Sequence, residues 1–394
     1  MSDKNNKTLK PGWRRVKFGD VVRLSKARSQ DPLADGIERY VGLEHLEPGD
    51  LRIRSWGSVA DGVTFTSVFQ PGQVLFGKRR AYQRKVAVAD FSGLCSGDIY
   101  VLETKDAQVL LPELLPFICQ TDAFFDHAVG TSAGSLSPRT NWTSLADFEF
   151  ALPSIAEQVE LVEVLRATEA TIEAQVNAAE IGRVTRSALV EDALAANFDP
   201  EVAKPLGTYL TDLRYGSSSR SSYEEKGYPI LRIPNVLRGR VDYSDLQHIE
   251  LNDTEYERLA LRKGDVLLVR TNGNPQYVGR SVVIDHLHEK TVYASYLIRI
   301  RCDESTLRPA FLAEFLNAPT TRQRLRGEVK SSAGNYNINI AGIRKQPICA
   351  PNVVDQDALL LQLKDLDGAS EALEARVAAT KAIKKQLFAE MWGT

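Results

Sequence analysis

A chain of 394 residues with 43% hydrophobic and 25% charged residues is long enough to form two domains, each with its own apolar core. No apolar run approaches the roughly 18 residues that span a membrane, and the polar first residues do not resemble a signal sequence, so we expect a cytoplasmic protein with no membrane partner. Four widely spaced cysteines, Cys95, Cys119, Cys302 and Cys349, indicate neither a disulfide framework nor a zinc site.

The first 153 residues have the pattern of a mixed α/β domain. Trp13 to Val22 predicts a first strand or a short helix, and the apolar periodicity from Pro112 to Phe125 is helical. Between these segments lie short β-prone runs at 39–43, 72–77, 84–88 and 98–102.

Ser154 to Asn197 predicts a single long helix. Its start carries a capping box, in which the Ser154 oxygen accepts a hydrogen bond from a free amide and Glu157 reaches back. At 1.5 Å per residue the helix would extend roughly 65 Å, more than a compact domain requires, so we interpret it as a spacer. The apolar stripe that would pair with another helix consists of Val162, Leu165, Ile172, Val176, Ala179 and Val190, with breaks at Glu169, Arg183 and Arg186.

The second half of the chain repeats this order. Residues 200–352 predict another mixed α/β domain, with strands at 230–233, 266–270, 279–284 and 292–300 and a helix from Pro309 to about Leu316. A second long helix starts near Asn352, and its apolar residues are Leu363, Leu366, Leu373, Val377, Leu387 and Met391. The predicted domains are therefore 1–153 and 200–352, separated by antiparallel coiled-coil helices at 154–199 and 353–394.

Matching segments about 200 residues apart indicate an internal duplication. Thr131–Gly134 corresponds to Ser331–Gly334, and Gln158 corresponds to Gln356. Segments 40–45 and 71–76 correspond, in the same order, to 230–235 and 263–268. Solenoid repeats are about 20–50 residues long, so this period belongs to a duplicated domain. Two similar domains on an antiparallel helix pair would be related by an approximate twofold axis, as are the strands of duplex DNA.

The net charge of −2 hides a segregation along the chain. The two predicted domains carry net charges of +1 and +5, whereas the two long helices carry −6 and −2. A polyanion such as nucleic acid would therefore contact the domains rather than the helices.

Cations and amides follow the same predicted strand in both copies. Arginine and asparagine side chains bind base edges, whereas lysine and small polar groups mostly bind phosphates. A solvated surface loop would explain the polar segment after either strand alone, but the equivalent placement of the two segments favours nucleic-acid binding. The candidate DNA-binding residues are Lys78, Arg79, Arg80, Tyr82, Arg84 and Lys85 in the first domain, and Arg270, Thr271, Asn272, Asn274, Tyr277, Arg280, Asn335, Tyr336 and Asn337 in the second.

Asn274 to Tyr277 resembles the catalytic Asn-Pro-Pro-Tyr signature of adenine-N6 methyltransferases, with glutamine in place of the second proline. Such an enzyme also needs a glycine-rich nucleotide loop, and none precedes this segment, so we favour a turn. Phosphate-loop, metalloprotease and serine-hydrolase motifs are missing, and His286 with His288 is more typical of a loop pair than of a metal site. The sequence predicts no catalytic residue, metal or cofactor for this chain.

Together these features resemble the specificity subunits of type I restriction-modification systems. The resemblance is carried by Gly130–Ser132 leading into Leu152–Gln158, by Tyr228–Arg232 and by Asp265–Thr271, and it covers essentially the whole chain. Leu-Pro-Ser-Ile and Ala-Pro-Asn-Val stand where the family usually has Leu-Pro-Pro-Leu.

The resemblance implies two target-recognition domains that each read one half of a bipartite, asymmetric double-stranded DNA site, and helices that dock two methyltransferase subunits. The partner subunits would use S-adenosylmethionine, ATP and magnesium, and the sequence leaves open whether a restriction and translocase subunit joins them. Two alternative functions stay open: a DNA-binding adaptor of another defence or modification system and, less favoured, an adenine-N6 methyltransferase acting through Asn274–Tyr277.

Overall fold

The computed structural model describes residues 9–237, 239–287, 289–332 and 334–392. The chain divides into two compact units: unit 1 comprises Met1–Val176 and Ala375–Thr394, and unit 2 comprises Asn177–Glu374. Each long helix therefore contributes one part to each unit. No helix in the described ranges is long and apolar enough to span a membrane.

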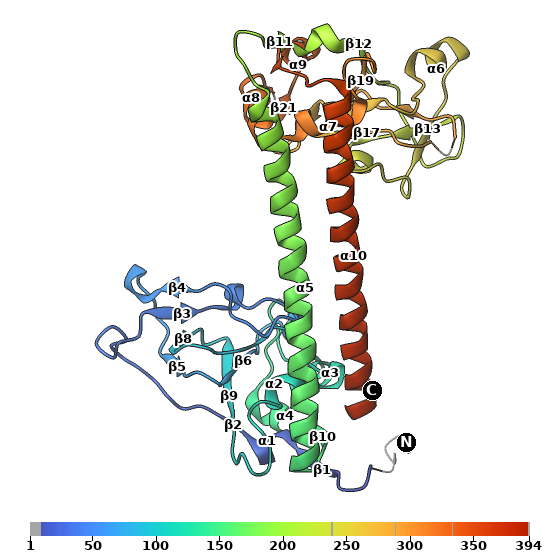
Figure 1. Ribbon diagram of the computed structural model, residues 1–394. Helices are drawn as coiled ribbons and strands as arrows, with labels where there is room; N and C mark the ends of the chain where they lie inside the picture. Colours follow the sequence, from blue (N-terminus) through green and yellow to red (C-terminus); the bar gives the residue numbers. More distant parts are fainter. Residues whose placement is uncertain (1–8, 238, 288, 333, 393–394) are drawn as a thin grey trace. The chain divides into compact units, whose positions relative to one another are not determined.

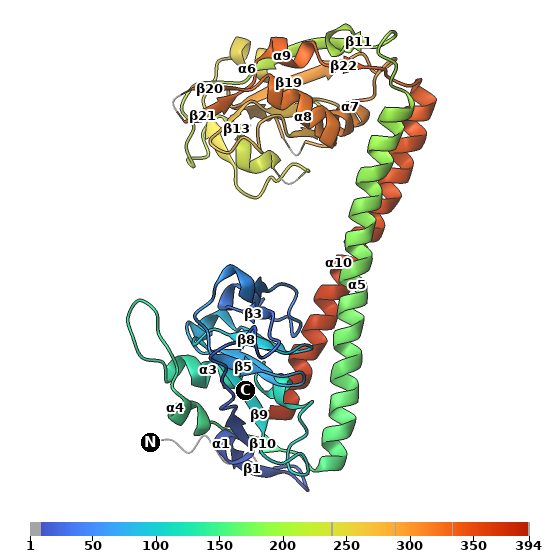
Figure 2. The same cartoon turned by 90° about the vertical axis from the view of Figure 1, so that its left-hand side faces the viewer.

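Unit 1 is built on two four-stranded sheets (Figures 1 and 2). The first sheet is antiparallel, and its strands are, in order, β2 (Val22–Leu24), β9 (Ile99–Thr104), β6 (Val74–Gly77) and β7 (Val86–Val88). The second sheet has a parallel pair at its centre, and its order is β4 (Gly57–Ser58), β3 (Arg39–Val41), β8 (Gly93–Cys95) and β5 (Ser67–Phe69). Separately, β1 (Arg14–Lys17) pairs with β10 (Glu149–Leu152) just before the long helix.

Short helices complete the core of unit 1. They are α1 (Phe18–Val21), α2 (Leu115–Ile118), α3 (Asp122–Gly130) and α4 (Trp142–Ala146). The rings of Phe18 and Phe124 are fully buried, with their centroids 4.9 Å apart. The helical run predicted over Pro112–Phe125 is split, because the Thr121 hydroxyl accepts a hydrogen bond from the amide of Phe124 and starts a new helix there.

Unit 2 repeats this topology. Its antiparallel sheet has the order β12 (Leu210–Tyr215), β19 (Leu297–Cys302), β15 (Val266–Val269) and β17 (Ser281–Val283). Its second sheet has the order β14 (Gln247–Ile249), β13 (Tyr228–Leu231) and β18 (Val292–Tyr293), again with a parallel pair. β11 (Lys204–Pro205) pairs with β22 (Pro347–Ile348), as β1 pairs with β10 in unit 1. The structure thus confirms the duplication and the mixed α/β class.

The helices of unit 2 follow the same plan with one addition. They are α6 (Asp253–Leu259), α7 (Pro309–Asn317), α8 (Pro319–Gly327) and α9 (Ile340–Arg344). α7 was expected from the apolar periodicity. α8 was missed because it offers no apolar stripe: its buried residues are Thr321, Arg322 and Leu325.

Two buried glutamines occupy the same place in both units. Gln158 accepts a hydrogen bond from the Leu111 amide at 2.9 Å and donates to the Val109 and Pro153 carbonyls, both at 3.0 Å. Gln356 makes the matching three bonds, from the Arg308 amide at 2.8 Å and to the carbonyls of Thr306 at 3.0 Å and Pro351 at 2.7 Å. Both glutamines are fully buried. Each glutamine fastens the start of a long helix to residues 109–111 or 306–308, and the equivalence of the two glutamines agrees with their alignment in sequence.

The predicted long helices are α5 (Ile155–Ala196) and α10 (Val353–Trp392) (Figure 1). The capping box is present, because Glu157 accepts from the Ser154 amide at 3.1 Å and its own amide donates to Ser154 Oγ at 3.4 Å. Asn352 caps α10 by accepting from the amide of Asp355 at 3.0 Å. Both helix starts were therefore correctly located from local sequence.

Ion pairs show that the helices run antiparallel within each unit. In unit 1 Glu169 pairs with Lys384, and Thr380 donates to Gln175 at 3.5 Å. In unit 2 Arg183 donates to Glu374 at 3.1 Å, and Arg186 to Asp367 at 2.6 Å. Glu169 and Arg186 were expected to break the apolar stripe. Instead they lie in the seam, where their partners neutralise them.

The residues predicted to pair the helices fall into three groups. Val162 and Leu165 are buried in the core of unit 1. Val176 is 44% exposed, because the seam passes through Gln175 and Ala179 on either side of it. The remaining residues are half-buried: Ile172, Leu366, Leu373, Val377 and Leu387.

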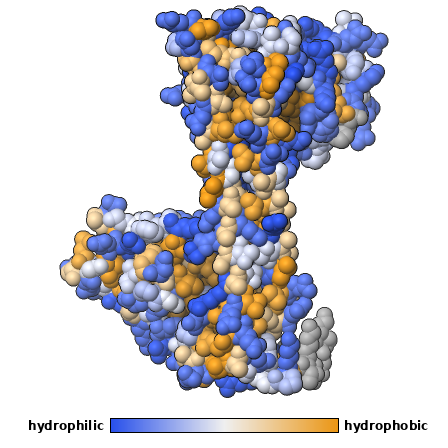
Figure 3. Space-filling view, viewed as in Figure 1, coloured by the Kyte–Doolittle hydropathy of each residue, from blue (hydrophilic) through white to orange (hydrophobic). Residues whose placement is uncertain are grey.

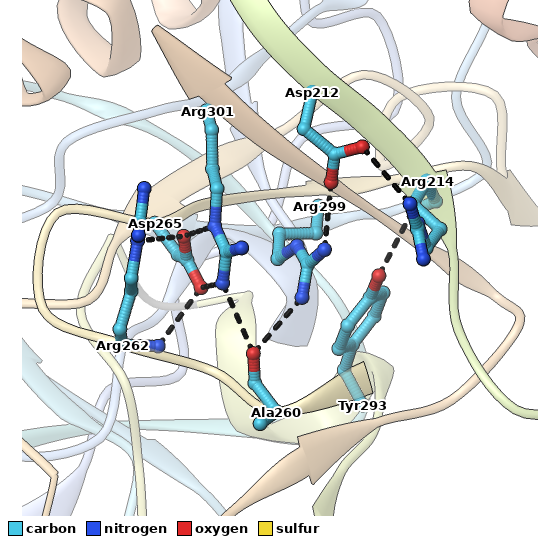
Figure 4. Close-up of polar contacts among 8 residues, drawn as sticks. All are labelled: Asp212, Arg214, Ala260, Arg262, Asp265, Tyr293, Arg299 and Arg301. Carbon is cyan, nitrogen blue, oxygen red and sulfur yellow. Dashed lines mark hydrogen bonds and ion pairs between the residues drawn. The ribbon is translucent and has the colours of Figure 1, made fainter. Parts of the chain in front are cut away.

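A buried polar network in unit 2 joins the sheet to the end of α6 (Figure 4). Arg299 Nη2 donates to Asp212 at 2.6 Å and Arg301 Nε donates to Asp265 at 2.5 Å. Both guanidinium groups also donate to the carbonyl of Ala260, at 2.9 and 3.1 Å, which satisfies the carboxyl end of the helix.

Candidate nucleic-acid interface

The cationic segment of unit 1 pairs with a second loop that is distant in sequence. The Arg80 amide donates to the Pro138 carbonyl at 2.7 Å, and the Thr140 amide donates to the Lys78 carbonyl at 3.0 Å. Arg79 and Arg139 face each other across the same contact as an isolated β-bridge. Residues 78–80 and 138–140 therefore form one surface.

Asp98 lies between two guanidinium groups of this surface. It accepts hydrogen bonds from Arg79 Nη1 at 3.1 Å and Arg139 Nε at 2.8 Å. Burial alone would raise the pKa of Asp98, but the two arginines outweigh it and hold the pKa below its usual value. Arg79 and Arg80 both donate to the Ser137 hydroxyl, at 3.0 and 3.3 Å. Arg79 and Arg80 are half-buried, and their Nε atoms lie beneath the surface with no hydrogen-bond partner among the described residues.

Arg84 and Lys85 are engaged inside the fold. Arg84 donates to Asp122 at 2.6 Å, and its Cζ atom lies 4.5 Å from the ring centre of Phe125. Lys85 donates to the Leu43 carbonyl at 2.7 Å. These two predicted site residues therefore fix the loop to its neighbours, and their charge is less available to a ligand.

Lys78 and Tyr82 have opposite surroundings. Lys78 Nζ lies 4.6 Å from the ring centre of Tyr100, and burial lowers the pKa of this lysine. Tyr82 is 55% exposed. It lies between Arg80 and Arg84, whose left-handed φ angles of 54° and 55° are uncommon for residues other than glycine. These two arginines are the cap residues of the short helical turn Ala81–Gln83 that carries the tyrosine.

In unit 2 the structure brings two predicted segments together in a small sheet. β16 (Thr271–Asn272) pairs with β21 (Asn335–Asn337), which places Thr271 opposite Asn337 and Asn272 opposite Tyr336. β20 (Lys330–Ser332) is the third strand. In both units the segment that follows β6 or β15 is therefore joined to the segment that precedes the last short helix, α4 or α9.

The two predicted arginines of unit 2 stack on tyrosines. Arg270 Cζ lies 4.6 Å from the ring centre of Tyr215, and Arg280 Cζ lies 4.7 Å from that of Tyr277. Arg280 also donates to the Leu237 carbonyl at 3.3 Å. Neither arginine forms an ion pair with a carboxylate in the described ranges. Stacking holds the planar groups in place while leaving their charge uncompensated.

The turn interpretation of Asn274–Tyr277 is confirmed. The Asn274 amide donates to Asn272 Oδ1 at 2.8 Å, and the Gln276 amide donates to Asn274 Oδ1 at 2.9 Å. Both asparagine oxygens are thus used to shape the backbone.

Three contributors were missed in the sequence: Arg139, Tyr215 and Arg322. Arg139 and Tyr215 reach the site through pairing between distant segments, for which no local signal exists. Arg322 comes from α8, and it donates to the Gln276 carbonyl at 2.7 Å and to that of Val278.

Metal and thiol chemistry find no support in the described residues. No group of three or more His, Cys, Asp or Glu side chains in them is placed to hold a metal ion, and His288 lies outside them. All four cysteines are free, and burial raises the pKa of Cys95 to about 12.

Known proteins resemble this chain in sequence and in fold. The chain is 32% identical over 186 residues to the type I restriction enzyme EcoKI specificity subunit of Escherichia coli K12, which covers 46% of this chain and 40% of that protein. It is 31% identical over 227 residues to the EcoDI specificity subunit of Escherichia coli, covering 54% and 48%. Over these stretches the chain is similar to type I restriction enzyme specificity subunits.

These alignments span less than half the length of the two curated relatives. A solved structure described as the structural basis of complex assembly and conformational transition of the type I R-M system covers 98% of this chain and 97% of its own. Its TM-score is 0.59 at 19% identity, which shows a shared fold. No family model matches the sequence.

Proposed function

We propose that this chain is the non-catalytic DNA-specificity subunit of a type I restriction-modification complex, and that it binds a bipartite, asymmetric DNA target. One observation carries the proposal: both units pair the segment after the same central strand with the segment before the same short helix, and both pairs present arginine or amide side chains. A duplicated scaffold with different side chains at one place is suited to two different half-sites.

We rank the candidate residues by their surroundings within each unit. We propose Arg79 and Arg80 for base contacts in unit 1, because both lie half-buried on the surface that residues 78–80 form with residues 138–140, with Tyr82 beside them. In unit 2, Arg270 and the amides of Asn335 and Asn337 take that role. Lys78, Arg84, Lys85, Thr271, Asn272, Asn274, Tyr277, Tyr336 and Arg280 would position the loops or bind phosphate.

The long helices supply candidate surfaces for methyltransferase subunits. Figure 3 shows that apolar residues remain at the surface. On the unit 1 part of α5, Val159, Val164 and Val176 are 44%, 50% and 44% exposed. Apolar residues outside the helix seam favour a protein partner. We propose two methyltransferase subunits as those partners, with a restriction and translocase subunit as a further one.

Mapping methylated adenines tests the proposal. A host that carries this chain and its methyltransferase should show methylation at one bipartite sequence with a fixed gap. Replacing residues 78–85 and 131–140 together should change one half of that sequence only. Methylation without a bipartite consensus would contradict the proposal.

A further inference from the structure

A hollow beside the recognition loops of unit 2 is lined by three arginines. Its volume is about 640 Å³, and its lining includes Arg280, Arg322, Arg326, Gln276 and Gln323. Arg280 comes from the loop before β17, whereas the other two arginines come from α8. No carboxylate in the described residues pairs with any of the three.

Arg322 is built into the wall of this hollow. It is only 9% exposed, and it donates to the Gln276 carbonyl at 2.7 Å and to the Val278 carbonyl. Burial, with Arg280 and Arg326 nearby, lowers the pKa of Arg322 to about 10, so it stays charged at neutral pH. A buried cation without a counter-ion is costly unless an anion joins it.

Gly279 makes room for this guanidinium group. Its φ of 84° is left-handed, and a Cβ atom there would lie 2.5 Å from Arg322 Nη1. Phe76 and Leu268 are equivalent in the two units, and they lie opposite Val86 and Ser281. Arg84 and Gly279 each lie two residues before these partners, so Gly279 occupies the position of Arg84.

The matched position in unit 1 is neutralised. α3 and α8 each contain nine residues, and their fourth residues are Phe125 and Arg322. In unit 1 the guanidinium group comes from the loop, as Arg84, and Asp122 of the helix pairs with it at 2.6 Å. In unit 2 it comes from the helix, as Arg322, and no acid among the described residues pairs with it. α3 contains two aspartates and no arginine, whereas α8 contains three arginines and no acid.

We infer that the hollow lined by Arg280, Arg322 and Arg326 is a phosphate site, and that it holds the DNA backbone beside the half-site bound by unit 2. Arginines bind phosphate oxygens through paired donors, and Gln323 adds an amide donor. The inference rests on the proposed DNA binding and deepens it: the two units would read bases alike but hold the backbone with unequal charge.

The salt dependence of DNA binding tests this inference with the full chain. The logarithm of the association constant should be plotted against the logarithm of salt concentration for a duplex of mixed sequence. Arg326→Gln should make the slope shallower by about one, and Arg280→Gln with Arg326→Gln by about two. The control is Arg258→Gln, which removes an exposed arginine of α6 outside the hollow and should leave the slope unchanged.

A second arm separates the DNA backbone from a free anion. Thermal unfolding should be followed with millimolar inorganic phosphate at constant ionic strength, for the wild type and for Arg326→Gln. If the hollow binds the DNA backbone, any phosphate effect that depends on Arg326 should be accompanied by the shallower slope of Arg326→Gln. A slope unchanged by Arg326→Gln while the wild type binds DNA would overturn the inference and leave the proposed function standing. A phosphate effect that depends on Arg326, without a change of slope, would reassign the hollow to a small anion. If the wild type does not bind DNA at all, the proposed function is refuted together with the inference.

Discussion

The carboxylate of Asp212 makes the stability of unit 2 dependent on pH. Burial alone would raise the pKa of Asp212, but Arg299, with Arg214 and Arg301 nearby, lowers it below its ordinary value. The depressed folded-state pKa means that this stabilisation is complete above the unfolded carboxyl pKa of about 3.9 and is lost as the pH falls below it. Asp212→Asn should cost about 1–3 kcal/mol at pH 7, because Arg299 stays buried without its partner. Denaturant titrations at pH 7 and at acid pH check this, with Asp192→Asn on the exposed side of α5 as the control; the cost should shrink in acid.

The arginines of unit 1 should separate into binding and structural groups. Arg80→Ala should weaken DNA binding at one half-site, by about 1–3 kcal/mol at a single base position if it contacts a base. Arg84→Ala should instead lower the thermal unfolding midpoint, because it removes the ion pair with Asp122 and the stacking on Phe125. Arg270→Ala should act at the other half-site. Methylation of a panel of singly mutated target sites measures each effect, and identical losses from Arg80→Ala and Arg270→Ala at the same half-site would contradict the assignment.

Asn274 is the residue through which the proposed lack of catalytic activity can be tested. Its oxygen shapes the turn, so Asn274→Ala should change DNA affinity or specificity through the loop. The purified chain should neither methylate nor cleave DNA, and calorimetry should detect no stoichiometric S-adenosylmethionine binding by either protein. Binding of S-adenosylmethionine that Asn274→Ala abolishes would revive the catalytic alternative.

Equivalent strand pairs in the two units carry reversed charges. In unit 1 Arg23 lies opposite Glu103 across β2 and β9, and they pair at 2.7 Å. In unit 2 Asp212 lies opposite Arg301 across β12 and β19. If β2 paired with β19 during folding, Arg23 would face Arg301, and like charges in direct opposition are destabilising. We interpret the reversal as a feature that keeps the two copies from exchanging strands.

A charge exchange tests this interpretation. Arg23→Glu alone should destabilise unit 1 by about 0.2–1 kcal/mol, because the pair is partly exposed, and adding Glu103→Arg should restore the loss. The doubly exchanged protein should nevertheless refold in lower yield, since its β2 now suits β19. Equal refolding yields for this protein and the wild type would show that the reversal has no such effect.

Elements with local signals could be predicted, and contacts between distant segments could not. Both long helices start where Ser154 and Asn352 cap them, because capping depends on neighbours in sequence. The strands that were predicted lie within a few residues of observed strands, but short strands such as β4, β5 and β8 were not predicted. The pairing of residues 78–80 with residues 138–140 could not be predicted, because these segments are distant in sequence and meet only when the sheet has folded. α8 was missed because arginine and threonine occupy its buried side, so it shows no apolar period. The hollow beside it was missed for the same reason.

At the scale of the whole molecule, α5 and α10 each pass from one unit to the other. We propose that the pair sets the gap between the half-sites. The seam fixes the register of the helices, since Glu169 must meet Lys384 and Arg186 must meet Asp367. A change of length must therefore be made in both helices if the seam is to survive.

Matched insertions test the role of the helix pair as a spacer. Four residues inserted after Ala178 in α5 and four after Arg376 in α10 should add about 6 Å along the axis with a rotation of only about 40°. Base pairs rise about 3.4 Å, so the gap in the target should lengthen by one or two base pairs while both half-site sequences stay the same. Two-residue insertions should rotate each stripe by about 200°, break the seam and abolish activity. Sequencing the methylated sites made by the four-residue variant gives the measurement. An unchanged gap, or altered bases in either half-site, would exclude a spacer role for the helix pair.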